Sequence, residues 1–125
     1  MVLEVYQGFL RQWGLTDENT LAAVYNVAVF LTRLGRYEES VRTLRRHVHP
    51  AQKKLGANHE IVLSLQQHLA YSSARTATSR KELTEALSSM QAVYERRLRV
   101  FGAAHPLTRI YEEDVAKIRG LLGDV

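Results

Sequence analysis

Cysteine is absent from this 125-residue sequence, proline occurs twice and glycine seven times. Without cysteine the chain has no thiolate nucleophile, no Cys-ligated zinc and no disulfide. No apolar run approaches the ~20 residues that a membrane-spanning helix needs. The N-terminal segment lacks the basic stretch and continuous apolar block of a secretory signal. The sequence therefore favours an intracellular protein without membrane insertion, cytoplasmic by default; an organellar location after removal of a transit peptide stays open.

Positive charge is concentrated in one part of the chain. The formal net charge is +4, and residues 36–56 contain six Lys or Arg against two Glu, which accounts for all of it. Nucleic-acid sites usually combine such charge with aromatic residues or a known motif, and Tyr37 is the one aromatic residue in this segment. A solvated helix face is therefore the favoured interpretation, and nucleic-acid binding is a remote alternative. The basic surface in question consists of Arg42, Arg45, Arg46, Lys53 and Lys54.

Apolar residues recur every three or four positions along nearly the whole chain. This spacing places them on one side of a helix, and no alternation typical of strands is present. The pattern predicts an all-α fold of about six helices, at roughly 2–13, 18–34, 37–55, 59–75, 80–101 and 106–121. Because a short helix is rarely stable alone in water, each apolar stripe must pack against neighbouring helices.

The helix-ending signals recur in register. Gly14, Gly56 and Gly102 each follow an apolar residue, and the intervals between them are 42 and 46 residues. Alanine stands fourteen residues after each glycine, at Ala28, Ala70 and Ala116. A small residue at a fixed helix position lets a neighbouring helix approach closely, so we expect all three alanines to have similar surroundings. A repeat of this length with two helices predicts a solenoid of antiparallel helical hairpins.

Two features carry a family resemblance. Residues 22–44 (AAVYNVAVFLTRLGRYEESVRTL) resemble a tetratricopeptide repeat, although Ser40 replaces the usual alanine of the second helix. The linkers KKLGANHEIVLS and RVFGAAHPLTRI resemble those of the long repeats in kinesin light chains and of arrays abundant in unicellular algae. The resemblance implies one superhelical domain over 1–125: helix B of a partial unit (1–14), two repeats (15–56 and 57–102) and helix A of a partial unit (103–125).

This resemblance also implies a function and a site. Tetratricopeptide arrays bind peptides or helices of other proteins in a groove lined by the A helices, so the chain is expected to be a protein-binding adaptor or scaffold. Asn26 stands where the family has an asparagine that holds a peptide backbone, and two equivalent arginines suit an acidic ligand. The groove positions carried over by register are Tyr25, Asn26, Val29, Arg33, Gln67, His68, Tyr71, Arg75, Glu113, Asp114 and Lys117.

The residues indicate neither catalysis nor a metal or other cofactor. His47 and His49 are two apart and so face different sides of a helix, whereas helical metal pairs are three or four apart. Neither a nucleophile elbow nor a phosphate-binding glycine loop is present. We therefore expect a protein without enzymatic activity. The alternative to groove binding is a structural subunit of a larger assembly or homo-oligomer, held through its unpaired end helices.

Overall fold

The computed structural model describes residues 2–123 and contains six helices in that range. They are α1 (Val2–Trp13), α2 (Glu18–Arg33), α3 (Tyr37–Leu55), α4 (Glu60–Thr76), α5 (Arg80–Phe101) and α6 (Pro106–Leu122). The predicted all-α fold and its helices are thus confirmed to within a residue at each end. The terminal residues 1, 124 and 125 of the expected domain lie outside the described part.

Equivalent side chains start the even-numbered helices. Asp17, His59 and His105 each accept a hydrogen bond from the backbone N–H two residues later, at 2.9, 3.2 and 3.1 Å. These caps satisfy N–H groups that have no partner within the helix. Gly56 and Gly102 end the preceding helices with φ of 94° and 83°, a region that disfavours other residues. The shared cap chemistry explains why each linker turns the chain in the same way.

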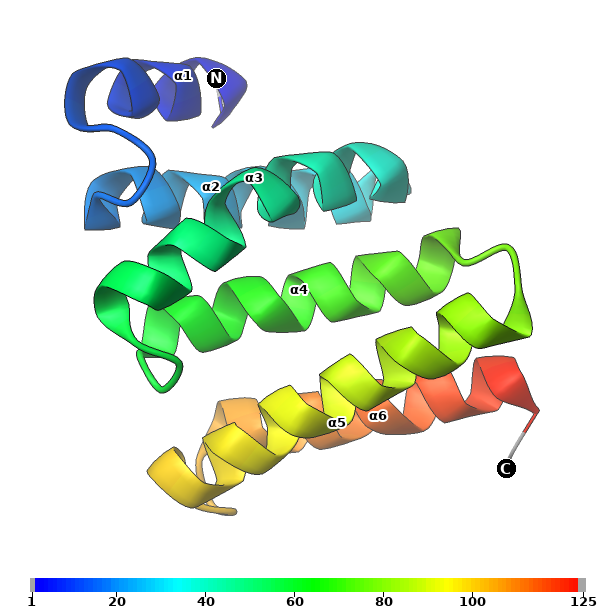
Figure 1. The fold of residues 1–125 in the computed structure, drawn as a ribbon. Coiled ribbons are helices and arrows are strands. Elements are labelled where there is room, and N and C mark those ends of the chain that lie inside the picture. Colours follow the sequence, from blue (N-terminus) through cyan, green and yellow to red (C-terminus); the bar gives the residue numbers. More distant parts are fainter. Residues whose placement is uncertain (1, 124–125) are drawn as a thin grey trace.

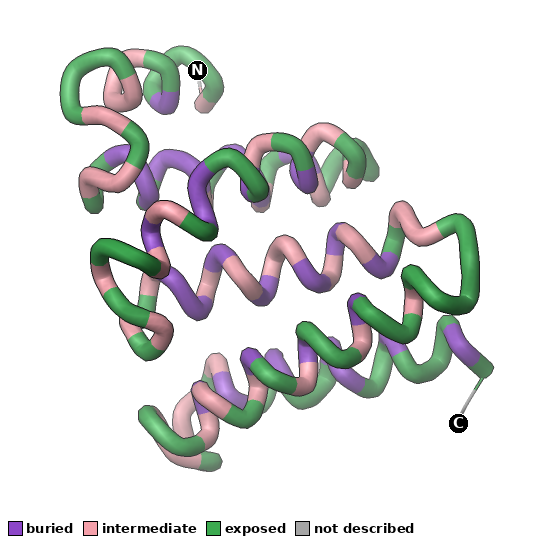
Figure 2. The backbone as a smooth tube through the Cα atoms, viewed as in Figure 1, coloured by how far each residue is buried: buried purple, intermediate pink, exposed green. Residues whose placement is uncertain are grey.

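The helices stack as successive antiparallel hairpins (Figure 1). Each helix packs against its neighbours in the sequence, and α4 also contacts both α2 and α6. Among the described helices α3 and α5 do not pack against each other, and α1 meets α3 through the side chains of Tyr6 and His47. The even-numbered helices therefore form a continuous layer, and the odd-numbered helices lie on it with little contact between them. Buried residues follow the faces between these helices (Figure 2) and form two apolar clusters, one around α2 and one between α4, α5 and α6.

The three repeated alanines do not share one environment. Ala28 and Ala70 are buried, whereas Ala116 is exposed. The expectation of similar surroundings is therefore wrong for Ala116, because none of the described helices packs on that side of α6. Ser40, which departs from the family pattern, is buried and accepts a hydrogen bond from Ser72 Oγ at 3.3 Å. Its hydroxyl therefore has the partner that a buried polar group needs.

Candidate partner-binding surface

Two equivalent contacts join the even-numbered helices. The rings of Tyr25 on α2 and His68 on α4 meet edge to face, with 5.1 Å between centroids. Gln67 on α4 donates from Nε2 to Oδ2 of Asp114 on α6 at 2.5 Å. Tyr25 and Gln67 lie eleven residues after Gly14 and Gly56, and their partners lie twelve residues after the next glycine. The same two positions of the repeat thus join successive even-numbered helices, by a ring contact between α2 and α4 and by a hydrogen bond between α4 and α6.

Burial changes the charge state of this surface. It lowers the pKa of His68 to about 4, so the imidazole is neutral near pH 7. Burial also raises the pKa of Asp114, and the hydrogen bond from Gln67 acts in the opposite direction. Gln67 and Asp114 are themselves buried. These side chains therefore hold the helices together and present little polar surface to a ligand.

The remaining predicted groove residues fall into two groups. Asn26, Arg33, Glu113 and Lys117 are exposed on α2 and α6, and Val29 is half-buried. Tyr71 is half-buried and Arg75 is exposed, and both lie against Tyr37 at the start of α3. The two tyrosine rings are 6.3 Å apart, and the Arg75 guanidinium is 5.3 Å from the centre of the Tyr37 ring. We call the first of these groups, which consists of Asn26, Val29, Arg33, Glu113 and Lys117, the even-helix surface.

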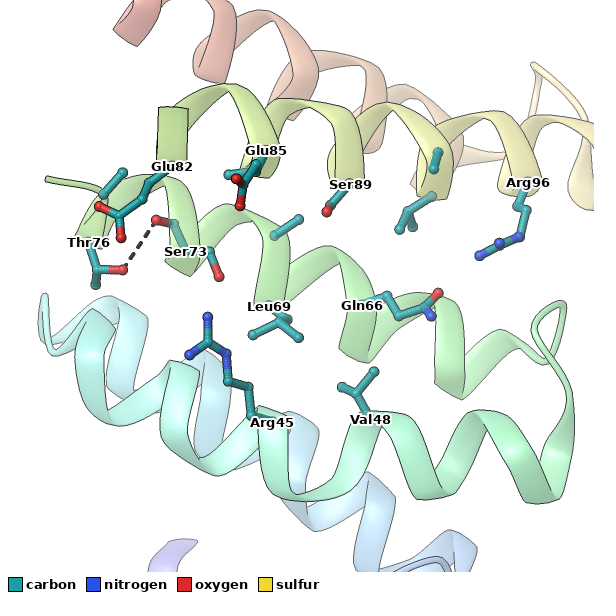
Figure 3. Close-up of a pocket in the computed structure, with 15 residues that line it drawn as sticks. Arg45, Val48, Gln66, Leu69, Ser73, Thr76, Glu82, Glu85, Ser89 and Arg96 are labelled. Atoms are coloured by element: carbon teal, nitrogen blue, oxygen red, sulfur yellow. Dashed lines mark hydrogen bonds between the residues drawn. The ribbon is translucent and has the colours of Figure 1, made fainter. Parts of the chain in front are cut away.

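The basic surface of α3 is exposed throughout, at Arg42, Arg45, Arg46, Lys53 and Lys54. One member has a distinct position. Arg45 reaches into a hollow that the sequence did not predict, a pocket of about 440 Å³ between α3 and α5 with α4 as its floor (Figure 3). We call it the α3–α5 slot; it is lined by Arg45 and Val48, by the 66–77 face of α4 and by the 82–96 face of α5. It exists because α3 and α5 both pack on α4 without touching each other.

His47 and His49 differ as their spacing predicted: His47 is buried and His49 is exposed. The Nδ1 atom of His47 lies 2.9 Å from the Leu15 carbonyl oxygen, and Nε2 lies 2.7 Å from the Tyr6 hydroxyl. Since a carbonyl only accepts, Nδ1 carries the proton and Tyr6 donates to Nε2. Burial lowers the pKa of His47. This histidine joins α1, α3 and the first linker, and residues 2–123 contain no His, Asp and Glu cluster suited to a metal ion.

Arg97 on α5 is a buried cation between two aromatic rings. Its side chain is 0% exposed, and the guanidinium carbon is 4.7 Å from the ring centres of both Phe101 and Tyr111. Among the described residues its three side-chain nitrogens have no hydrogen-bond partner. The ring faces attract the charge, but they do not replace the hydrogen bonds of water. Arg97 therefore holds α5 against α6 at a cost in desolvation.

The two ends of the stack have different chemistry. Val5 on α1 is 49% exposed, whereas His47 and Val93, the equivalent residues of α3 and α5, are 0% and 4% exposed. At the other end, Arg109 and Glu112 of α6 stand where α2 has the buried residues Leu21 and Val24, and both are exposed. At these positions the N-terminal end thus presents an apolar side chain, and the C-terminal end presents charged side chains.

Stacked helical hairpins with equivalent caps and contacts define a helical-repeat protein. Residues 74–107 match the family model of the tetratricopeptide repeat, and the stacked helical hairpins are a fold of the tetratricopeptide type. The matched segment extends from the end of α4 through α5 to the start of α6. No curated protein and no solved structure matches the chain.

Tetratricopeptide repeats generally mediate protein–protein interactions, and the family is typically non-catalytic. Within residues 2–123 none of the helices combines the length and the apolar character required to cross a membrane.

Proposed function

We propose that the chain is a non-catalytic adaptor or scaffold that binds a peptide or helix of a partner protein on the even-helix surface. The repeated contacts Tyr25–His68 and Gln67–Asp114 carry this proposal. Because they occupy equivalent positions, they hold α2, α4 and α6 in one register. Exposed side chains on these helices are thereby presented along a common face, which is what docking of a linear ligand requires.

The exposed groups favour a polar ligand with acidic side chains. The amide of Asn26 can donate to a peptide carbonyl and accept from a peptide N–H at the same time. The guanidinium of Arg33 is exposed and can form two parallel hydrogen bonds to a carboxylate. Lys117 adds a second cation on α6. A partner segment with carboxylates at two points would match this surface.

Peptide-array screening with the purified chain, followed by binding titrations, tests the proposal. Asn26→Ala and Arg33→Glu are expected to weaken binding of the selected acidic peptides, Arg33→Glu by about tenfold because attraction becomes repulsion. Lys54→Glu, the same charge reversal on the exposed side of α3, is the matched control and should leave binding unchanged. If neither even-helix variant weakens binding, or no protein ligand is found, the proposal fails.

A structural role is the second candidate, and the exposed apolar end of α1 favours it. In a homo-oligomer or larger assembly, Val5 would be covered as its equivalents in α3 and α5 are. Light scattering at several concentrations should then show association that Val5→Glu abolishes. A monomer at all concentrations counts against association of copies through this end.

A further inference from the structure

Opposite charges face the α3–α5 slot from the two ends of one helix. Glu85 lies near the start of α5 and Arg96 near its end, and both line the slot (Figure 3). Neither side chain forms a hydrogen bond or ion pair with any residue in the described range. Glu82, beside Glu85, already accepts hydrogen bonds from the N–H and hydroxyl of Thr78, at 2.9 and 2.7 Å. The unpaired charges that α5 presents to the slot are therefore the carboxylate of Glu85 and the guanidinium of Arg96, which lie at opposite ends of it.

The middle of the slot is suited to a polypeptide backbone. Its floor carries the apolar side chains of Leu69 and Ala70, flanked by the hydroxyl groups of Ser73 and Ser89. Arg45 reaches in from the α3 wall in Figure 3, also without an ion pair within the described range. Small floor and wall residues allow a chain to approach closely, while hydroxyl and guanidinium groups can bind peptide carbonyls and N–H groups.

The length of the slot sets the length of its occupant. Glu85 and Arg96 are eleven residues apart on α5, which corresponds to about 16 Å along a helix axis. An extended chain rises about 3.3 Å per residue, so about five residues span this distance. Side chains one, three and five of an extended segment point in the same direction. All three can therefore face the slot together.

We propose that the α3–α5 slot binds an extended segment of a partner protein, about five residues long, with a basic residue facing Glu85, an apolar residue over Leu69 and an acidic residue facing Arg96. Arg45 donates to carbonyl groups of the segment. The segment can bind in either chain direction, because its side chains, and not its backbone, are matched to Glu85 and Arg96.

This site is separate from the even-helix surface. Leu69 and Ala70 lie on the side of α4 opposite His68 and Tyr71, as the helical spacing requires. The chain would then offer two docking faces, and each can be tested without the other. Failure of both Asn26→Ala and Arg33→Glu to weaken binding would overturn the function proposed above and leave this site untouched.

An array of capped pentapeptides provides the test, with Lys-Xaa-Leu-Xaa-Glu and its reverse as probes. Both are expected to bind more tightly than peptides that carry Gln in place of Lys and Glu. Glu85→Arg should change the preference to peptides with acids at both ends, and Arg96→Glu to peptides with lysines at both ends, each by about tenfold. Glu95→Arg and Arg99→Glu, exposed α5 residues outside the slot, are the matched controls. Ala92→Trp, at an exposed slot residue, should block binding of every probe.

Three results would overturn the proposal. The first is selection of no charged peptide over its neutral counterpart. The second is an equal change of preference in the control variants, which would indicate general surface electrostatics. The third is self-association without peptide binding that Ala92→Trp abolishes, which would assign the slot to a second copy of the chain. Circular dichroism of each variant verifies that the helices are retained.

Discussion

Acidification from pH 7 to pH 4.5 is expected to destabilise the fold through His68. Burial lowers the pKa of this histidine to about 4, from an ordinary value of 6.5. Between these values the unfolded chain binds a proton at this position and the folded chain does not. The free energy of unfolding therefore falls as the pH falls. The effect fades above pH 6.5, where the unfolded histidine also loses its proton, and is absent once both states are neutral.

The size of the effect follows from proton linkage. A histidine with pKa 6.5 unfolded and about 4 folded contributes a loss of about 2 kcal/mol between pH 7 and pH 4.5. His47 has the same sign, because burial lowers its pKa too. Asp114 has the opposite sign: burial raises its pKa, so the folded state takes up this proton first as the pH falls. Only a comparison of variants isolates the share of His68.

Urea unfolding followed by circular dichroism at pH 7 and pH 4.5 provides that comparison. Wild type should lose about 2 kcal/mol more than His68→Gln over this interval. His49→Gln, which removes an exposed histidine from α3, should behave like wild type. If His68→Gln loses as much stability as wild type, the claim that burial keeps this imidazole neutral is refuted.

Four further substitutions test the packing and the backbone. Arg97→Met keeps a long side chain between the two aromatic rings but removes an unpaired buried charge, so urea melts should show a gain of about 1 kcal/mol or more; an equal loss would mean that the cation–aromatic contacts dominate. Tyr6→Phe leaves Nε2 of His47 without its donor and should cost about 1–2 kcal/mol in the same assay. Gly56→Ala forces alanine into a positive φ and should cost about 1 kcal/mol or more, whereas Gly8→Ala, inside α1 with open space around it, should raise the melting temperature through a gain of about 0.5–1 kcal/mol. Equal effects of the two glycine changes would contradict this reasoning.

The helices and their ends could be predicted because their causes are local. Apolar spacing, the glycines at Gly56 and Gly102, and the caps His59 and His105 act within a few residues of the chain. The repeat register followed from the same residues. It assigned Gln67 and Asp114 to the groove side of two A helices, but it did not predict that their side chains would bond to each other.

The prediction of the site was less complete for a physical reason. Register places a residue on a helix face, but it does not say how closely the next helix approaches. Tyr71 and Arg75 lie against Tyr37, and His68 lies against Tyr25. Free ligand-binding groups and interhelical contacts are indistinguishable in a sequence, because both are polar or aromatic residues at the same positions of the repeat.

Amino-acid order alone determined the six helices of residues 2–123 and their boundaries, because helix periodicity and capping depend on neighbours in the chain. Tertiary packing alone decided which repeated positions are covered. Ala116 is exposed, Arg97 is enclosed by two rings, and α3 and α5 stay apart over α4. Each of these outcomes depends on distances between segments far apart in the sequence, and those distances arise only when the hairpins pack together.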